Sequence, residues 1–124
     1  MGALGKKGKQ MGLDQRAYAT KGGKEITLAE WRKHNRLQGW MDNLYRSRGG
    51  DEVFNLIPIE LTSDDIDELE ETVRGAMLPK TEGFFFGRDS YDDMNYHTTN
   101  DLNFVAKARK ALADGCTVSY ECFW

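Results

Sequence analysis

The stretch LTSDDIDELEETVRGAM at residues 61–77 decides the fold class, because it predicts a capped helix with one face that must be buried. Thr62 can accept a hydrogen bond from the first turn, and Asp65 three positions later completes a capping box. Leu61 and Ile66 stand at the positions of a hydrophobic staple. The apolar residues recur at helical spacing and define the expected buried stripe: Ile66, Leu69, Val73 and Met77.

The same signals predict a helix on each side of this stretch. Thr27 and Glu30 have the spacing of a second capping box, so a helix is expected from Thr27 to the Gly49-Gly50 pair. Its apolar residues gather on one arc of a helical wheel: Trp31, Leu37, Trp40, Met41, Leu44 and Tyr45. A third helix is expected to begin near Asn100 and to end at Gly115.

Four segments have the character of short strands, namely residues 14–20, 54–61, 83–87 and 117–124. Pro58 cannot donate to a strand ladder, so the second segment is expected at an edge of the sheet. The three phenylalanines of the third cannot alternate between core and water, which favours a central strand covered on both faces. The prediction is an α+β fold, a small sheet of about four strands with three helices packed on it, in the order β-α-β-α-β-α-β.

The length of 124 residues predicts one domain. No apolar run approaches the roughly 18 residues that a membrane-spanning helix needs, so no membrane contact is expected. Residues 1–10 are rich in Gly and Lys and are interpreted as a flexible basic arm or a tag, which leaves residues 11–124 as the domain. Cys116 and Cys122 lie too far apart along one strand to form a disulfide, and a cytoplasmic location is therefore predicted.

Charge is distributed unevenly along the chain. Residues 1–50 carry eleven Lys and Arg against four acids, whereas residues 51–124 carry six against sixteen. The two halves can attract each other within one folded domain, or they can present a two-signed surface to a protein partner or an acidic face that imitates nucleic acid. Nucleic-acid binding through the acidic half is disfavoured, because phosphate contacts require a basic surface.

His34 is the polar residue whose predicted position is least expected for a polar side chain. On the wheel of the first helix it falls near the middle of the apolar arc, one turn after Glu30. A buried imidazole must satisfy both ring nitrogens, and a carboxylate at i−4 could orient it as a catalytic base is oriented. Because Glu30 is also assigned to the capping box, a structural histidine and a pocket or catalytic histidine both stay open.

The neighbours of His34 are also candidates for a site: Arg32, Lys33, Asn35 and Arg36. Arginine offers a planar fork and lysine a point charge, so this group could grip a phosphate or a carboxylate. A solvated helix face has the same composition. The sequence has no Gly-rich phosphate loop before this helix, which counts against a nucleotide site.

Residues 88–99 offer oxygen and nitrogen ligands for a divalent cation: Asp89, Asp92, Asp93 and His97. Their spacing matches neither an EF-hand nor a zinc-hydrolase pattern, and loop solvation explains the same residues. No serine or cysteine sits in a nucleophile elbow. No metal ion or cofactor is therefore predicted, and the catalytic residues, if there are any, stay unassigned.

Four motifs stand out along the chain. They are Met11-Gly-Leu-Asp14 followed by Tyr18, Trp31-Arg-Lys-His-Asn35 leading to Trp40, Gly83-Phe-Phe-Phe-Gly87 followed by Ser90-Tyr91, and the aromatic end at Trp124. In combination they resemble a family of small uncharacterised proteins of bacteriophages and bacteria, which typically open M-G-L-D, carry W-R-K-x-N on their first helix and contain G-F-F-F-G. The resemblance spans residues 11–124, and residues 1–10 depart from it.

The resemblance implies a phage-type accessory protein that acts inside an infected host cell. The expected ligand-binding residues are Arg32, Lys33, His34, Asn35, Phe86, Tyr91 and Trp124. The leading expectation is a non-enzymatic protein that binds a host protein or a small ligand. The alternative is a small enzyme or nucleotide-binding domain that uses His34 with Arg32 and Lys33.

Overall fold

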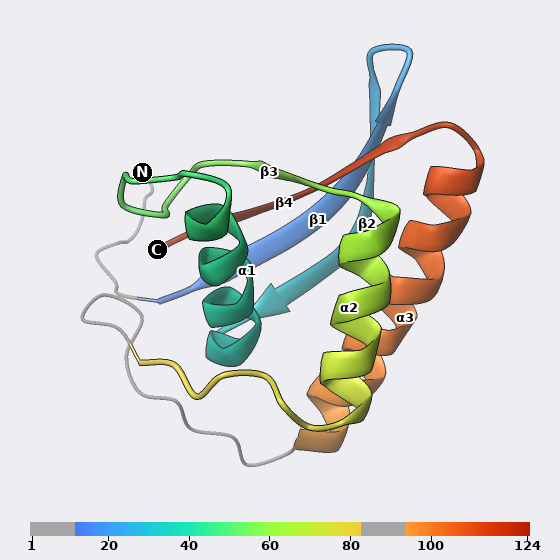
Figure 1. Cartoon of the computed structure of the whole chain (residues 1–124). Helices are drawn as coiled ribbons and strands as arrows, with labels where there is room; N and C mark the ends of the chain where they lie inside the picture. Colours follow the sequence, from blue (N-terminus) through green and yellow to red (C-terminus); the bar gives the residue numbers. More distant parts are fainter. Residues whose placement is uncertain (1–11, 83–93) are drawn as a thin grey trace.

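The computed structural model describes residues 12–82 and 94–124. Within them the elements are β1 (Asp14–Lys21), β2 (Lys24–Arg32), α1 (Asn35–Ser47), β3 (Ile59–Leu61), α2 (Ser63–Arg74), α3 (Met94–Ala113) and β4 (Thr117–Phe123). The four strands form one antiparallel sheet in the order β2-β1-β4-β3 (Figure 1). The predicted α+β class is confirmed, but the order along the chain is β-β-α-β-α-α-β instead of a strict alternation.

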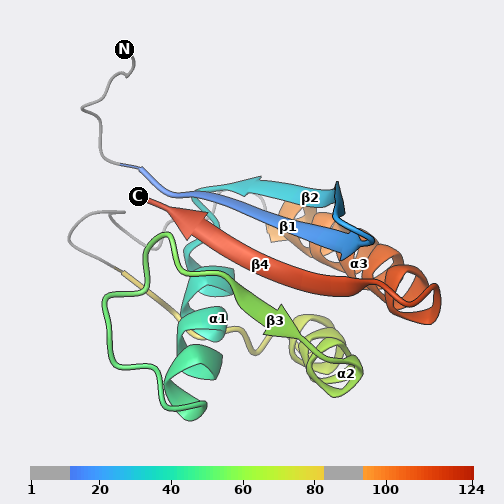
Figure 2. The same cartoon turned by 90° about the horizontal axis from the view of Figure 1, so that it is seen from above.

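The three helices lie on one side of the sheet (Figure 2). Helices α2 and α3 run side by side, whereas α1 stands apart from them (Figure 1). The β1–β2 hairpin extends beyond the body of the domain. In the described part of the chain no helix covers the other face of the sheet, so the core lies between the helices and the sheet.

The central strands β1 and β4 turn every second side chain towards the helices. These buried side chains are Gln15, Ala17, Ala19, Val118, Tyr120 and Cys122. The helices contribute fully buried apolar residues to the same core: Leu37, Met41, Ile66, Leu69, Phe104 and Val105. Trp31 joins them from β2 and meets Phe104 edge to face, with ring centroids 5.3 Å apart. Alternation along a half-buried antiparallel sheet accounts for this arrangement.

Helix α2 has the predicted N-terminus. Thr62 Oγ1 accepts from the Asp65 amide at 3.2 Å, and the Asp65 carboxylate accepts from the Thr62 amide at 2.8 Å, which confirms the capping box. The predicted buried stripe is wrong at Met77, which is 75% exposed. The helix ends at Arg74, and the positive φ of Ala76 turns the chain away before Met77 could continue the stripe.

The predicted start of the first helix is wrong, because Lys24–Arg32 is strand β2. The Gly22-Gly23 pair takes φ values of 60° and 80°, which suit a two-residue hairpin turn and pair this segment with β1. Pairing along the whole hairpin outweighs a local capping signal, and Glu30 is an exposed strand residue. Helix α1 begins only at Asn35, after Lys33 reverses the chain with a φ of 56°.

The remaining strand predictions have mixed outcomes. The first and last strands match β1 and β4, and β3 is an edge strand as expected, although it covers only Ile59–Leu61 and begins after Pro58. Helix α3 begins at Met94, earlier than predicted, so the second half of the expected loop at 88–99 is helical. The predicted strand at 83–87 lies outside the described residues.

Candidate functional site

His34 occupies the junction between β2 and α1 and is fully buried. Strand β2 ends at Arg32, and the left-handed backbone of Lys33 reverses the chain, so that His34 becomes the N-cap residue of α1. Its side chain makes no capping hydrogen bond to α1. The turn therefore sends the imidazole into the interior, where other elements must satisfy it.

The partner of His34 is Asp101 of α3, which is 1% exposed. Nε2 of His34 lies 2.9 Å from Oδ2 of Asp101, and the Trp31 indole Nε1 donates to Oδ1 at 2.9 Å. An ionised carboxylate only accepts hydrogen bonds, so Nε2 of His34 is the donor. Both oxygens of a buried carboxylate are thus engaged, which fixes the imidazole in one orientation.

A second imidazole stacks on His34. The rings of His34 and His97 lie 4.1 Å apart between centroids, with their planes 19° from parallel. His97 precedes Asp101 by one helical turn on α3, so both side chains lie on the face of α3 that meets His34. A single helix therefore supplies the carboxylate and the stacked ring.

A chain of buried polar side chains runs from this cluster along the inner face of the sheet. Gln15 Nε2 donates to the Tyr120 hydroxyl at 3.0 Å, and Tyr120 donates to Oε1 of Gln38 at 2.6 Å. Nε2 of Gln38 reaches Sγ of Cys122 at 3.1 Å. Gln15, Gln38 and Cys122 are each at most 3% exposed. Side chains from β1, α1 and β4 are thereby held in fixed positions.

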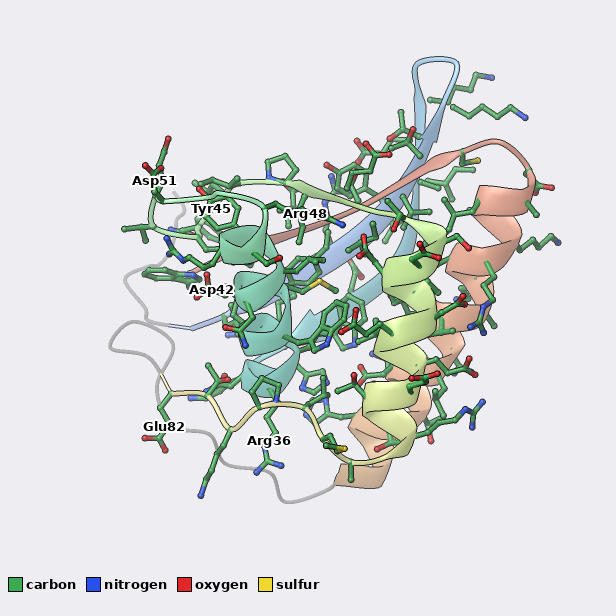
Figure 3. The ribbon with its side chains drawn as sticks, in the orientation of Figure 1. Arg36, Asp42, Tyr45, Arg48, Asp51 and Glu82 are labelled. Carbon is green, nitrogen blue, oxygen red and sulfur yellow. The ribbon has the colours of Figure 1, made fainter. Side chains whose placement is uncertain are left out.

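A cavity of about 330 Å³ lies beside the histidine pair. Its lining combines polar residues with an apolar wall: His34, Arg36, Val73, Ala76, Leu78, His97, Thr98 and Asp101. Arg36 extends from the first turn of α1 towards the chain segment that follows α2 (Figure 3). The walls come from the start of α1, the end of α2 with the segment after it, and the first turns of α3, so the cavity lies between these three parts of the chain.

Of the described residues predicted to form a site with His34, Arg36 lines the cavity, whereas Arg32, Lys33, Asn35 and Trp124 do not. Arg32 points to the opposite face of the sheet and pairs with Asp14 at 3.2 Å, and Lys33 is exposed. Asn35 is fully buried in the first turn of α1. Trp124 lies at the end of β4, where its Nε1 donates to the Phe54 carbonyl at 3.1 Å.

Three further expectations concern Glu30, the aromatic residues Phe86 and Tyr91, and the expected metal ligands. Glu30 is not the partner of His34, because strand pairing sends it to the outer face of the sheet. Phe86 and Tyr91 lie outside the described residues, as do the three aspartates of the expected cation loop. Among the residues that the structure describes, no three His, Cys, Asp or Glu side chains are grouped to hold a metal ion.

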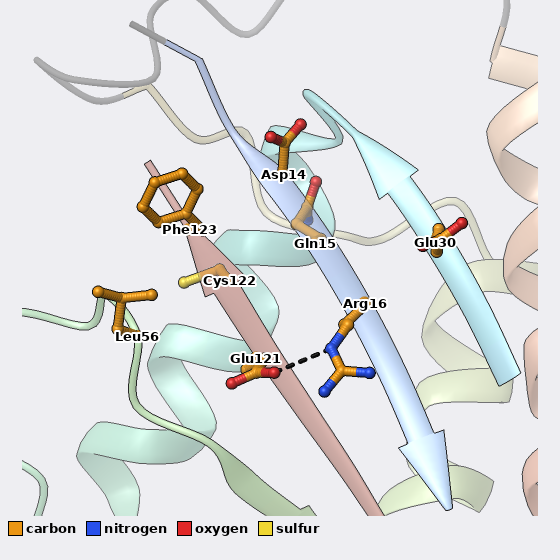
Figure 4. A pocket seen from close by; sticks show the side chains of 8 residues that line it. All are labelled: Asp14, Gln15, Arg16, Glu30, Leu56, Glu121, Cys122 and Phe123. Atoms are coloured by element: carbon orange, nitrogen blue, oxygen red, sulfur yellow. Dashed lines mark hydrogen bonds and ion pairs between the residues drawn. The ribbon is translucent and has the colours of Figure 1, made fainter. Parts of the chain in front are cut away.

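A second hollow of about 230 Å³ lies on the open face of the sheet (Figure 4). Exposed Leu56 and Phe123 provide its apolar part. Arg16 pairs with Glu121 at 2.9 Å and with Glu25 at 2.6 Å. Burial alone would lower the pKa of Arg16, but its hydrogen bonds to these two carboxylates raise it above the ordinary value. Because Arg16 is already paired with two carboxylates, this hollow is the weaker candidate.

None of the helices in residues 12–82 and 94–124 is long and apolar enough to cross a membrane. Comparisons of the chain with family models, with curated proteins and with solved structures found no match.

Proposed function

We propose that this protein is a non-enzymatic binding protein that takes up a small molecule in the cavity beside His34 and Asp101. The observation that carries the proposal is the buried His34–Asp101 pair, which forms part of the cavity wall and is held in one orientation by Trp31. Small-molecule sites are typically concave, mostly apolar and equipped with a few fixed polar groups. This cavity has that composition.

The energetic cost of the pair supports a role beyond packing. Burying a carboxylate costs several kcal/mol unless it is well paired, and well-packed apolar residues often stabilise a core at least as much as a buried ion pair. Asp101 nevertheless occupies such a position and receives two hydrogen bonds. A requirement for fixed polar groups at a cavity explains why this arrangement is present.

The resemblance to phage and bacterial proteins supports an accessory role inside an infected cell. A host protein is the other partner that this role allows. The cavity favours the small molecule, because its polar groups line one hollow between α1, α3 and the end of α2 instead of being spread over a flat surface.

Native mass spectrometry of protein purified gently from bacterial cells tests the proposal. We expect the wild-type protein to retain a small molecule. Thr98→Leu fills the cavity and should abolish retention, whereas Thr99→Leu, at the neighbouring exposed position, should leave it unchanged. Equal retention in both variants, or a bound host protein without a small molecule, would contradict the proposal.

Acid–base catalysis is the second candidate function, and the same His34–Asp101 pair favours it. Holding an imidazole in one orientation is the role of the carboxylate in catalytic Ser-His-Asp triads. The enzyme hypothesis predicts that wild-type protein chemically converts the retained molecule and that a folded His34→Gln variant does not. A molecule recovered unchanged from both proteins would exclude it.

A further inference from the structure

A groove lies between α1 and α2, which run in opposite directions and form its two walls (Figure 1). At one end the helices are linked, because Arg48 directly after α1 pairs with Asp65 in the first turn of α2. Towards the other end the segment after α2 lies against α1, where Thr81 packs so closely on Gly39 that an added Cβ would clash. The hollow of this groove measures about 310 Å³ and is lined by Trp40, Asn43, Leu44, Ser47 and Glu68.

The α1 wall offers apolar surface to the groove. Trp40 and Leu44 lie one helical turn apart, and Ser47 continues the same side of α1. Both apolar side chains pack against the core but are only partly buried, so part of each faces the groove. Tryptophan is enriched among the residues that dominate binding energy at protein interfaces. The α1 wall therefore suits an apolar side chain of a partner protein.

The α2 wall is acidic. Glu68 lines the groove, and Asp64 and Glu71 lie one turn before and one turn after it on the same exposed side of α2. None of the ion pairs among the described residues involves these three carboxylates. The neighbouring carboxylates of Asp65 and Glu70, in contrast, are paired with arginines. The acidic wall therefore has negative charge available for a partner.

Helix stability does not account for this arrangement of charge. The positive end of the helix dipole stabilises Asp64 in the first turn, but Glu71 stands in the last turn, where a negative charge is unfavourable. Like charges one turn apart also repel one another along the helix. Lysine or arginine side chains placed against this wall would remove that repulsion, which gives the groove charge complementarity to a basic partner.

We propose that the groove between α1 and α2 is the docking site for a basic amphipathic segment of a partner protein. The segment places an apolar side chain against Trp40 and Leu44 and a lysine or arginine beside Glu68. A nucleic acid is disfavoured, because its phosphates would meet carboxylates here. The groove shares no lining residue with the cavity beside His34, so this inference goes beyond the proposed small-molecule function and does not depend on it.

A synthetic peptide built of Leu-Lys-Lys-Leu repeats tests the docking site. We expect it to shift the backbone amide signals of Asn43, Leu44 and Ser47 and the indole N–H signal of Trp40 in a ¹H–¹⁵N NMR titration. The indole signal of Trp31 should stay unchanged, because this side chain is buried in the core. A peptide of Ser-Lys-Lys-Ser repeats should bind more weakly, and a peptide of Leu-Glu-Glu-Leu repeats should leave all these signals unchanged.

Two charge reversals test the acidic wall. Glu68→Lys should weaken binding of the basic peptide about tenfold, because it replaces an attraction at the groove by a repulsion. Glu30→Lys is the matched control, since it makes the same change of charge on the outer face of the sheet, and it should leave the affinity unchanged. Both positions are exposed, so both variants should fold. Equal weakening in both variants would mean that net charge alone governs binding and would overturn the role of the groove.

The peptide titrations also separate the proposed partner from other occupants of the groove. If the acidic peptide shifts the groove signals as strongly as the basic one, the acidic wall does not select the partner and the proposal is wrong. Signals that move when the protein alone is diluted would assign the groove to a second copy of this chain instead. If none of the peptides shifts them, the groove is not a docking site, and the small-molecule proposal is decided separately by the retention experiment.

Discussion

The side-chain amide of Gln15 binds both backbone groups of His34. Oε1 of Gln15 accepts from the His34 amide at 3.0 Å, and Nε2 donates to the His34 carbonyl at 3.0 Å. Beyond the last strand pair, Asp14 and Arg32, the Lys33 amide donates to the Leu13 carbonyl at 2.7 Å, and the glutamine side chain adds two hydrogen bonds at the next residue. This contact fixes the junction from which the His34 ring enters the cavity wall.

Gln15→Met should destabilise the protein by about 2 kcal/mol, because it keeps the length of the side chain but removes the side-chain acceptor of the buried His34 amide and one of the two donors to the His34 carbonyl, which also accepts from the Gln38 amide. The free energy of unfolding, measured by urea denaturation, reports the loss. The NMR signals of His97 and Asp101 should also shift, since His34 contacts both residues. A loss below about 0.5 kcal/mol would show that this contact does not hold the junction.

Asp101→Asn should cost about 2–3 kcal/mol in the free energy of unfolding. The substitution replaces one acceptor oxygen by an NH₂ group, which then faces a donor on either Trp31 or His34. The indole N–H signal of Trp31 in NMR spectra should move as its partner changes. Asp42→Asn is the matched control, because Asp42 forms an exposed pair with Arg46 and should cost less than about 1 kcal/mol. Equal costs would contradict a special role for Asp101.

Tyr120→Phe tests the buried chain of polar side chains. The Tyr120 hydroxyl accepts from Gln15 and donates to Gln38 in the interior, so its removal should cost about 1–2 kcal/mol. Tyr45→Phe removes a hydroxyl that accepts one exposed hydrogen bond from the Glu52 amide, and its effect should stay within about 0.5 kcal/mol. Chemical denaturation of both variants gives the comparison, and similar costs would mean that the buried hydroxyl contributes nothing beyond its surface counterpart.

Elements whose decisive signals are local have the structure that the sequence predicts. The capping box of α2 joins Thr62 and Asp65, three positions apart, and both hydrogen bonds are present. Lys24–Arg32 carries the same kind of signal at Thr27 and Glu30, but this segment is a strand and not the predicted helix. There the Gly22-Gly23 hairpin pairs the whole segment with β1, and that non-local pairing decides the outcome.

The difference between local and non-local signals also explains which residues of the site were predicted and which were not. The sequence pointed to His34 as a buried polar residue, and it is fully buried. Its partner Asp101 lies 67 positions away and Gln15 lies 19 positions away, and no local pattern connects them to His34. The predicted partner Glu30 depended on a helix that does not form there. The spacing of His97 and Asp101 at one helical turn was the available signal, but the helix was predicted to begin only near Asn100.

Cys122 should make the stability of the protein fall in alkaline solution. Burial raises the pKa of its thiol to about 11, against about 8.5 for an unfolded cysteine. The thiol therefore contributes fully below about pH 8.5, and its contribution disappears as the pH rises through 11, a loss of roughly 3 kcal/mol. Urea denaturation gives the free energy of unfolding of Cys116→Ala and of Cys116→Ala/Cys122→Ala at pH 8 and at pH 11. The difference between the two variants at each pH isolates the contribution of Cys122, because the other titrating groups are the same in both. A difference that stays constant between the two pH values would show that the Cys122 thiol ionises as easily in the folded protein as in the unfolded chain.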